Sequence, residues 1–150
     1  MGDITLNRTQ QMILTGAFGS YRAEQELTFS ATSTDQTVFT VTGDIIAQVT
    51  CVVGASCFSA GGCEVSLGIA DDPDAMIAAT EVGLLAQREI WHDATPDSEI
   101  EALDTMRSYI ITDGNDIMLD VEAGQQIDSG SLIFYAFWTP LSSGGNLVSA

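Results

Sequence analysis

Residues 116–140 read Asp-Ile-Met-Leu-Asp-Val-Glu-Ala-Gly-Gln-Gln-Ile-Asp-Ser-Gly-Ser-Leu-Ile-Phe-Tyr-Ala-Phe-Trp-Thr-Pro, and this stretch decides the fold. Apolar residues occupy every second position in residues 117–121, which is the period of a half-buried strand. Residues 132–138 are apolar at every position, so they predict a strand covered on both sides. The connection at 123–130 is too long for a two-residue hairpin turn. The stretch therefore predicts a final pair of strands that ends at Pro140.

Strand patterns recur along most of the chain. Alternating or β-branched runs predict strands at residues 37–53, 64–70, 88–93 and 109–112. The first of these runs is either two strands or one strand with a bulge at Gly43. Many short strands separated by turn residues are typical of an all-β sandwich or barrel.

Three segments carry weaker patterns. Residues 54–62 are small and turn-rich, and residues 75–87 fit neither period but allow a short helical turn. Residues 95–106 begin with Thr-Pro-Asp and predict either a short helix or a loop. We therefore predict an all-β fold with one β-sandwich domain at 37–150, either jelly-roll-like or immunoglobulin-like.

Residues 1–36 are polar and small, and they predict an extended N-terminal arm or a disordered tail. An arm of this kind becomes ordered only on a partner, because it cannot bury enough of its own surface. Its apolar residues are candidate interface residues: Met12, Ile13, Leu14, Phe18 and Tyr21.

The charge of the chain is strongly negative. It has 21 Asp and Glu residues against 4 Lys and Arg, and its formal net charge is -17. Such a surface repels phosphate backbones and anionic lipid surfaces, so we expect no nucleic-acid partner and no membrane partner. Hydrophobic residues make up 45% of the chain, which argues for a folded protein with an acidic surface. Adaptation to salt and a basic partner both explain this acidity.

The cysteines and the single histidine form no recognisable site in the sequence. Cys51, Cys57 and Cys63 are odd in number and lack the close pairs of zinc sites, so we interpret them as small buried thiols. One disulfide, within the chain or between subunits, is the alternative. His92 stands apart from them, and no phosphate-binding, dinucleotide or nucleophile motif is present. We predict no enzyme activity, no catalytic residue and no cofactor.

Two groups of residues have the chemistry of a binding site, and each also has a simpler interpretation. Oxygen ligands for a cation occur in two turns, at Asp71, Asp72 and Asp74 and at Asp113, Asn115 and Asp116. The same residue types are ordinary in turns, and we predict no metal site. Aromatic residues that could stack on a sugar, or else belong to the core, are Trp91, Trp138, Tyr135 and Phe137.

Five segments together resemble the small virion proteins of tailed bacteriophages, and in particular the head decoration, or cement, proteins. The segments are Phe39-Thr40-Val41-Thr42-Gly43, Ser66-Leu67-Gly68-Ile69-Ala70, Trp91-His92-Asp93-Ala94-Thr95-Pro96, Ile117-Met118-Leu119 and Ile133-Phe134-Tyr135-Ala136-Phe137-Trp138-Thr139-Pro140-Leu141. The resemblance covers roughly residues 37–148, and its motifs are structural. It implies a β-sandwich, often a trimer, that binds the major capsid protein on the outside of the shell.

We therefore expect a structural protein that is made in the host cytoplasm and located on the capsid exterior. In an assembled homo-oligomer, some of the last aromatic residues are expected to face a neighbouring subunit: Tyr135, Phe137 and Trp138. Alternatives are a tail, neck or fibre protein, a carbohydrate-binding β-sandwich, and an acidic mimic of nucleic acid.

Overall fold

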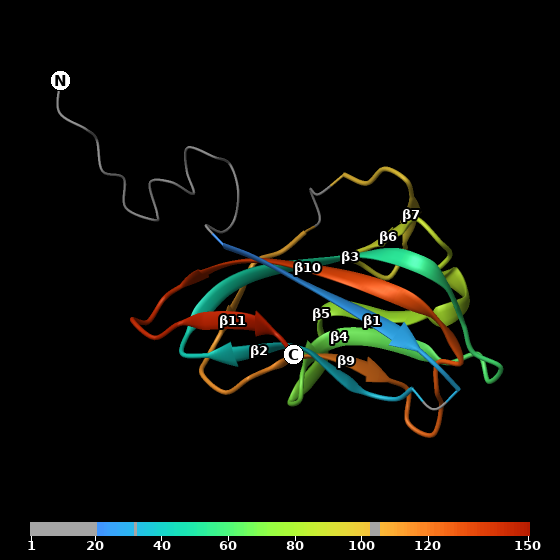
Figure 1. Cartoon of the computed structure of the whole chain (residues 1–150), viewed down its shortest axis with the longest axis horizontal. Helices are drawn as coiled ribbons and strands as arrows, with labels where there is room; N and C mark the ends of the chain where they lie inside the picture. Colours follow the sequence, from blue (N-terminus) through green and yellow to red (C-terminus); the bar gives the residue numbers. More distant parts are fainter. Residues whose placement is uncertain (1–20, 32, 103–105) are drawn as a thin grey trace.

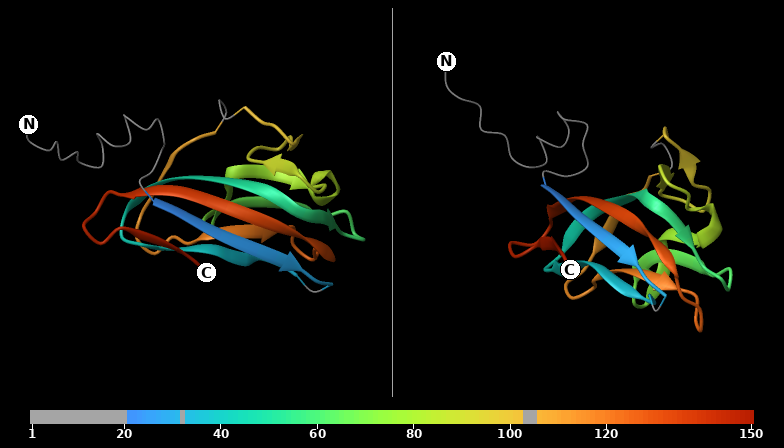
Figure 2. Two further views of the ribbon diagram at one scale, coloured as in Figure 1. Left: turned by 45° about the horizontal axis from the view of Figure 1, so that its top comes forward. Right: turned by 45° about the vertical axis from the view of Figure 1, so that its right-hand side comes forward.

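The strands pack as two antiparallel sheets, one above the other, in a computed structural model that describes residues 21–31, 33–102 and 106–150 (Figures 1 and 2). The six-stranded sheet has the order β1-β10-β3-β6-β7, with β8 paired to β3. Its strands are β1 (Tyr21–Phe29), β3 (Ile45–Phe58), β6 (Glu89–Trp91), β7 (Asp97–Ser98), β8 (Tyr109–Ile111) and β10 (Ser129–Pro140). The prediction of an all-β sandwich is confirmed.

The five-stranded sheet has the order β11-β2-β9-β4-β5. Its strands are β2 (Gln36–Thr42), β4 (Glu64–Ile69), β5 (Asp72–Glu81), β9 (Ile117–Val121) and β11 (Asn146–Ser149). A three-residue 3-10 helix, η1 (Val82–Leu84), follows β5. In the part of the chain that the structure describes, no helix has the length and apolar character needed to cross a membrane.

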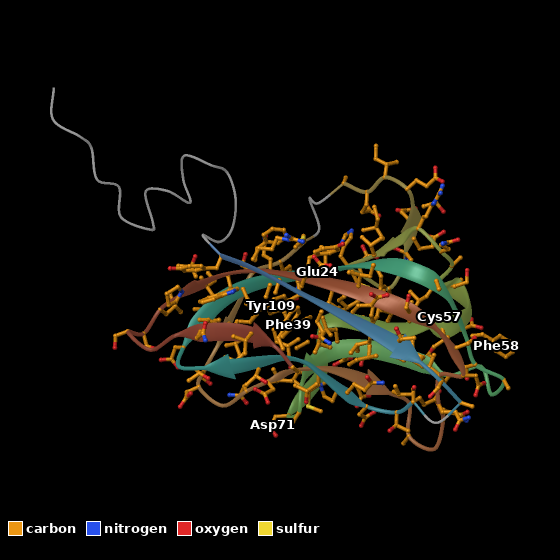
Figure 3. The ribbon with its side chains drawn as sticks, viewed as in Figure 1. Glu24, Phe39, Cys57, Phe58, Asp71 and Tyr109 are labelled. Atoms are coloured by element: carbon orange, nitrogen blue, oxygen red, sulfur yellow. The ribbon has the colours of Figure 1, made fainter. Side chains whose placement is uncertain are left out.

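The core lies between the two sheets and is built from the side chains that face inward at every second position of the strands. Phe134 and Trp91 contribute from the six-stranded sheet, and Phe39, Leu67 and Leu119 from the five-stranded sheet; all five are fully buried. Phe39 points into this space, whereas Phe58 points outward from the end of the sandwich (Figure 3). The Trp91 indole N–H donates a 2.9 Å hydrogen bond to Thr80 Oγ1, which joins β6 to β5 across the core.

The predicted pairing of the last two strands is wrong. Strand β9 lies between β2 and β4 in one sheet, and β10 lies between β1 and β3 in the other. The connection between β9 and β10 crosses from one sheet to the other, and its Ile127 is fully buried. That buried side chain at the end of the sandwich explains why the connection is longer than a hairpin turn.

The predicted boundary of the N-terminal arm is also wrong for the residues that the structure describes. Residues from Tyr21 onward belong to the sandwich, since β1 pairs with β10 along nine residues from Tyr21 to Phe29. Leu27 and Phe29 are buried, and this burial stabilises the strand at the edge of the sheet. The rest of the proposed arm, residues 1–20, lies outside the described residues.

Several weaker local predictions are corrected as well. The turn-rich segment 54–62 is partly strand, because β3 continues to Phe58. Residues 75–87 are mostly the edge strand β5, whose two register shifts against β4 disturb its period, and their helical turn is confined to η1. The predicted helix at 95–106 is absent from its described part, where β7 is followed by Glu99 at a φ of 65°. A left-handed residue at that position ends any right-handed helix.

Candidate functional site

One face of β10 is open, which corrects the prediction that the strand is covered on both sides. Leu132, Phe134, Ala136 and Trp138 face the core and are buried. The alternate side chains point away from the five-stranded sheet and are only half-buried. We call this surface of the six-stranded sheet the outer face. Its apolar members on β10 are Ile133, Tyr135 and Phe137.

The strand register extends the outer face across the whole sheet. Val52 of β3 is directly opposite both Ile133 of β10 and Ile90 of β6. Paired residues point to the same side of a sheet, so these three half-buried side chains form a continuous apolar row. Glu26 of β1 precedes the row and Asp97 of β7 follows it. The row therefore has an acidic residue at each end and apolar residues at its centre.

A second part of the outer face lies over the N-terminal half of β1. Arg22 stands opposite Phe137 and Glu24 opposite Tyr135 in the strand register. The guanidinium of Arg22 lies 5.2 Å from the centroid of the Tyr135 ring and forms a 2.5 Å ion pair with Glu24. Glu24 marks this edge in Figure 3. The aromatic side chains therefore have a charged border.

A hollow of about 420 Å³ opens on the outer face, next to the end of the row where Ile90 of β6 pairs with Asp97 of β7. Val52 and Ile90 line it together with Arg88 and Glu99, whose side chains form a 3.5 Å ion pair. Arg88 and Glu99 have φ values of 72° and 65°, and they are the non-glycine residues with positive φ in the described part of the chain. Strained backbone of this kind occurs preferentially at functional sites.

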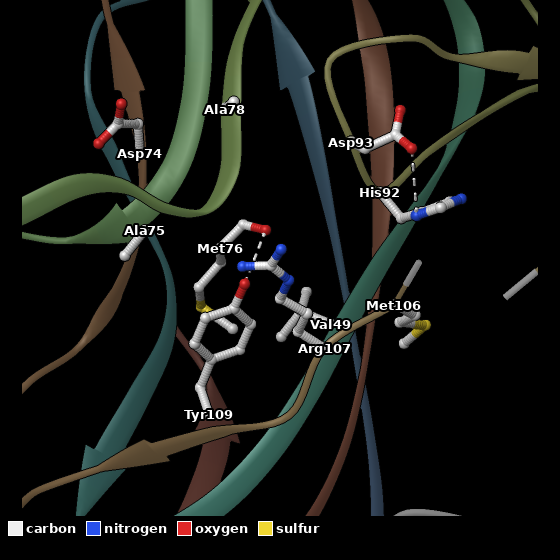
Figure 4. Close-up of a pocket in the computed structure, with 10 residues that line it drawn as sticks. All are labelled: Val49, Asp74, Ala75, Met76, Ala78, His92, Asp93, Met106, Arg107 and Tyr109. Carbon is white, nitrogen blue, oxygen red and sulfur yellow. Dashed lines mark hydrogen bonds and ion pairs between the residues drawn. The ribbon is translucent and has the colours of Figure 1, made fainter. Parts of the chain in front are cut away.

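A second cavity, of about 410 Å³, lies at the open edge of the sandwich between β5, β3 and β8 (Figure 4). It opens at a gap along the side of β3 that faces away from β10. On that side β6 pairs with Cys51 and Val52 and β8 pairs with residues 45–47, so the residues between these two pairings have no partner strand. Val49 lies in this gap and lines the cavity with Met76 and Tyr109. The Tyr109 hydroxyl donates a 3.4 Å hydrogen bond to the Met76 carbonyl.

His92 is the residue of this cavity with the greatest potential for acid–base chemistry. Its side chain is buried, with Nδ1 3.9 Å from Asp93 Oδ2 and Nε2 3.7 Å from Glu101 Oε2. Neither a serine nor a cysteine is among the described residues that line the cavity. The described geometry therefore brings no such nucleophile to His92, and the absence of enzyme activity stays a prediction.

The interpretation of the cysteines as small buried thiols is confirmed, since Cys51, Cys57 and Cys63 are all buried and free. Burial raises the pKa of the Cys51 thiol well above its usual value, and the neighbouring Cys57 raises it further. Burial also raises the pKa of Cys57 to about 12. Because nucleophilic attack and metal binding need the thiolate, these two cysteines are poorly suited to either role.

The residues of the second predicted cation turn bind the protein's own backbone. Asp113 Oδ1 accepts a 2.7 Å hydrogen bond from the Gly43 N–H, and Asp116 Oδ1 accepts a 2.9 Å bond from the Val41 N–H. Asn115 donates to the carbonyl of Thr112. No group of three or more potential metal ligands occurs among the described residues. Asn115 therefore closes its own turn, and the two aspartates tie that turn to residues 41–43.

In the first predicted cation turn, Asp71 and Asp72 are exposed, and Asp74 lies at the edge cavity and close enough to Asp120 to affect its ionisation. Partial burial raises the pKa of Asp120, and the carboxylates of Asp35 and Asp74 raise it further. The ionised form of Asp120 therefore destabilises the fold, and this penalty grows as pH rises through the raised pKa.

Replacing Asp120 with asparagine is expected to raise the melting temperature at pH 7, because the variant carries no charge at this position. The gain should disappear at about pH 3, where the wild-type carboxyl is protonated in both the folded and unfolded states. Thermal unfolding followed by circular dichroism between these pH values measures the difference. A gain of equal size at both pH values would show that charge repulsion is not its cause.

The predicted aromatic candidates separate into two groups. Trp91 is fully buried and Trp138 is 7% exposed, so neither offers a sugar-stacking surface, and that hypothesis is wrong for both. Trp138 stacks on Tyr21, with ring centroids 4.7 Å apart. Tyr135 and Phe137 are half-buried on the outer face. The other interface candidates lie outside the described residues: Met12, Ile13, Leu14 and Phe18.

Comparison of the chain with protein-family models, with curated proteins and with solved structures found no match in any of the three. The sequence predictions missed the contribution of β3, β6 and β7 to the outer face. The alternation of polar and apolar residues within 45–53 was the available signal, but it does not identify the neighbours of β3.

Proposed function

We propose that this chain is a non-enzymatic capsid decoration protein that binds the outer surface of a phage shell and stabilises it. The observation that carries the proposal is the half-buried apolar outer face at Ile133, Tyr135 and Phe137, on a central strand of the sandwich. These residues belong to one of the five segments that resemble head decoration proteins. The partner in this role is the major capsid protein.

The physical basis of the proposed role is burial of surface on assembly. A continuous apolar surface on a small protein indicates an interaction site, because water contact with it is unfavourable. When one copy binds across the seam between two shell subunits, both contacts must break before the subunits separate. A formal net charge of -17 suits a position on the outside of the shell, away from packaged nucleic acid.

Counting copies of the chain per virus particle by quantitative mass spectrometry tests the location. Hundreds of copies are expected for head decoration, whereas about a dozen or fewer would indicate a neck, tail or fibre protein. Absence from purified particles would refute the virion role altogether. Native mass spectrometry of the free protein tests the predicted trimer in the same preparation.

Replacing Phe137 with serine is expected to weaken binding to expanded shells several-fold, because the part of the ring that is exposed in the free protein is buried on the shell at about 25 cal/mol per Å². Binding is measured by co-sedimentation of the purified protein with shells. The control is Phe58→Ser, since Phe58 is 58% exposed and lies at the end of the sandwich, away from the outer face (Figure 3). Equal loss of binding in both variants would argue against the outer face as the contact.

A further inference from the structure

The apolar row of the outer face has a charge pattern that specifies its partner. Glu26 stands opposite Ile133 at one end, and Asp97 stands opposite Ile90 at the other. Four strand spacings of about 4.8 Å place these two acidic residues about 19 Å apart. Among the described residues, neither carboxylate forms an ion pair, whereas both arginines on this face are paired with a glutamate.

The hollow beside the row has the features of an anchor site. Val52 and Ile90 supply apolar walls, and the ion pair between Arg88 and Glu99 forms part of its rim. The backbone N–H of Glu99 donates a 3.1 Å hydrogen bond to the Arg88 carbonyl, so the two left-handed residues support each other. Binding energy at protein interfaces concentrates where an apolar side chain fills such a hollow.

A second copy of this chain is a poor occupant of the outer face. Two chains of net charge -17 repel each other, and a symmetric contact through this face brings two rows with acidic ends together. A surface with positive groups around an apolar centre meets both requirements of the row. Complementary charge of this kind directs association and excludes wrong partners.

We propose that the outer face docks on a shell-protein surface that presents an apolar centre between lysine or arginine side chains, with one apolar side chain placed in the hollow against Val52 and Ile90. This inference rests on the proposed function and names the contact surface and its chemistry. Glu26 and Asp97 each meet a positive group of the shell. Val52 and Ile90 favour an aliphatic or aromatic side chain in the hollow, because that side chain buries apolar surface against both.

The test of the acidic ends of the row is the double charge reversal Glu26→Lys with Asp97→Lys. We expect its affinity for expanded shells to fall about tenfold at low salt, with a much smaller difference at 1 M salt, where charges are screened beyond about 3 Å. The matched control is Glu81→Lys with Asp71→Lys, two exposed sites on the other sheet and its adjoining turn. Its affinity should stay at or above the wild-type value.

The test of the anchor is Glu99→Gly, which removes the ion pair and the left-handed strain together. The melting temperature should rise, because glycine adopts a φ of 65° without a steric penalty. Shell affinity should fall several-fold, because Arg88 loses the partner that positions it at the rim. A purely structural role for Glu99 predicts the rise in melting temperature with unchanged affinity, and that result would overturn the anchor.

The outcomes separate this inference from the proposed function. Bare shells after incubation with the wild-type chain would overturn both. Normal binding of the wild-type chain, together with equal binding by the Glu26→Lys and Asp97→Lys double variant, would overturn the docking surface and leave the decoration role standing. Selective loss of binding in the outer-face variants, with full occupancy by the control, is the expected result.

Discussion

Replacing Trp91 with alanine is expected to destabilise the protein by about 3–5 kcal/mol, a large share of the stability of a domain of this size. Trp91 is fully buried, and its ring lies edge-on to Phe134 with centroids 6.2 Å apart. Its indole N–H also donates to Thr80 Oγ1. The substitution therefore creates a cavity between the sheets and removes a hydrogen bond that joins them. Urea unfolding followed by circular dichroism measures the loss.

The variant Trp91→Phe separates the two contributions. It keeps an aromatic ring next to Phe134 but leaves the Thr80 hydroxyl without its donor, so we expect a smaller loss of about 1–3 kcal/mol. Wild-type stability in Trp91→Ala would contradict the arrangement of the core. Because Trp91 points away from the outer face, any Trp91→Phe protein that remains folded should bind shells normally.

Replacing Gly130 with alanine is expected to cost about 3 kcal/mol or more, because it combines backbone strain with a steric clash. Gly130 has a φ of 111°, a conformation that residues with a Cβ rarely adopt. A Cβ at this position would lie 2.6 Å from Cys57 Cα and 2.7 Å from the Ser56 carbonyl oxygen. Both contacts are with the backbone of β3, which cannot move without disturbing its pairing with β10. Chemical denaturation measures the loss.

The matched control for Gly130 is Gly114→Ala. Gly114 also has a positive φ, of 79°, but a Cβ there would meet no atom within 4 Å. This variant therefore reports the conformational strain alone, and we expect a loss of about 1 kcal/mol. Equal stability of the two alanine variants would contradict the close approach of the β3 backbone to Gly130.

The sequence predicted the strands well where the period of two was clear. Residues 64–70, 88–93 and 109–112 all contain the strands that their patterns indicate, at β4, β6 and β8. Prediction was poorer where pairing was irregular, as in β5, whose register shifts obscure the alternation. The residues of strand β1 were assigned to the extended arm, because Arg22, Glu24 and Glu26 give the segment the composition of a solvated one. Those residues point outward, while Leu27 and Phe29 face the core.

The candidate site was predicted only in part. Tyr135 and Phe137 were identified as interface candidates from the excess of apolar residues in 132–138, and the structure places both on the outer face. Trp138, chosen for the same reason, faces inward and stacks on Tyr21. The acidic residues Glu26 and Asp97 could not be identified, because the row that they flank is complete only after five strands have paired.

For the stretch at 116–140, the sequence by itself determined that two strands form, where each lies, and that β10 ends at Pro140. These features follow from local alternation and from the missing N–H of proline. Only the tertiary structure decided that the two strands belong to different sheets and that one face of β10 stays open. Alternation gives the orientation of each side chain relative to its own strand, whereas the neighbours of a strand depend on contacts between residues far apart in the chain.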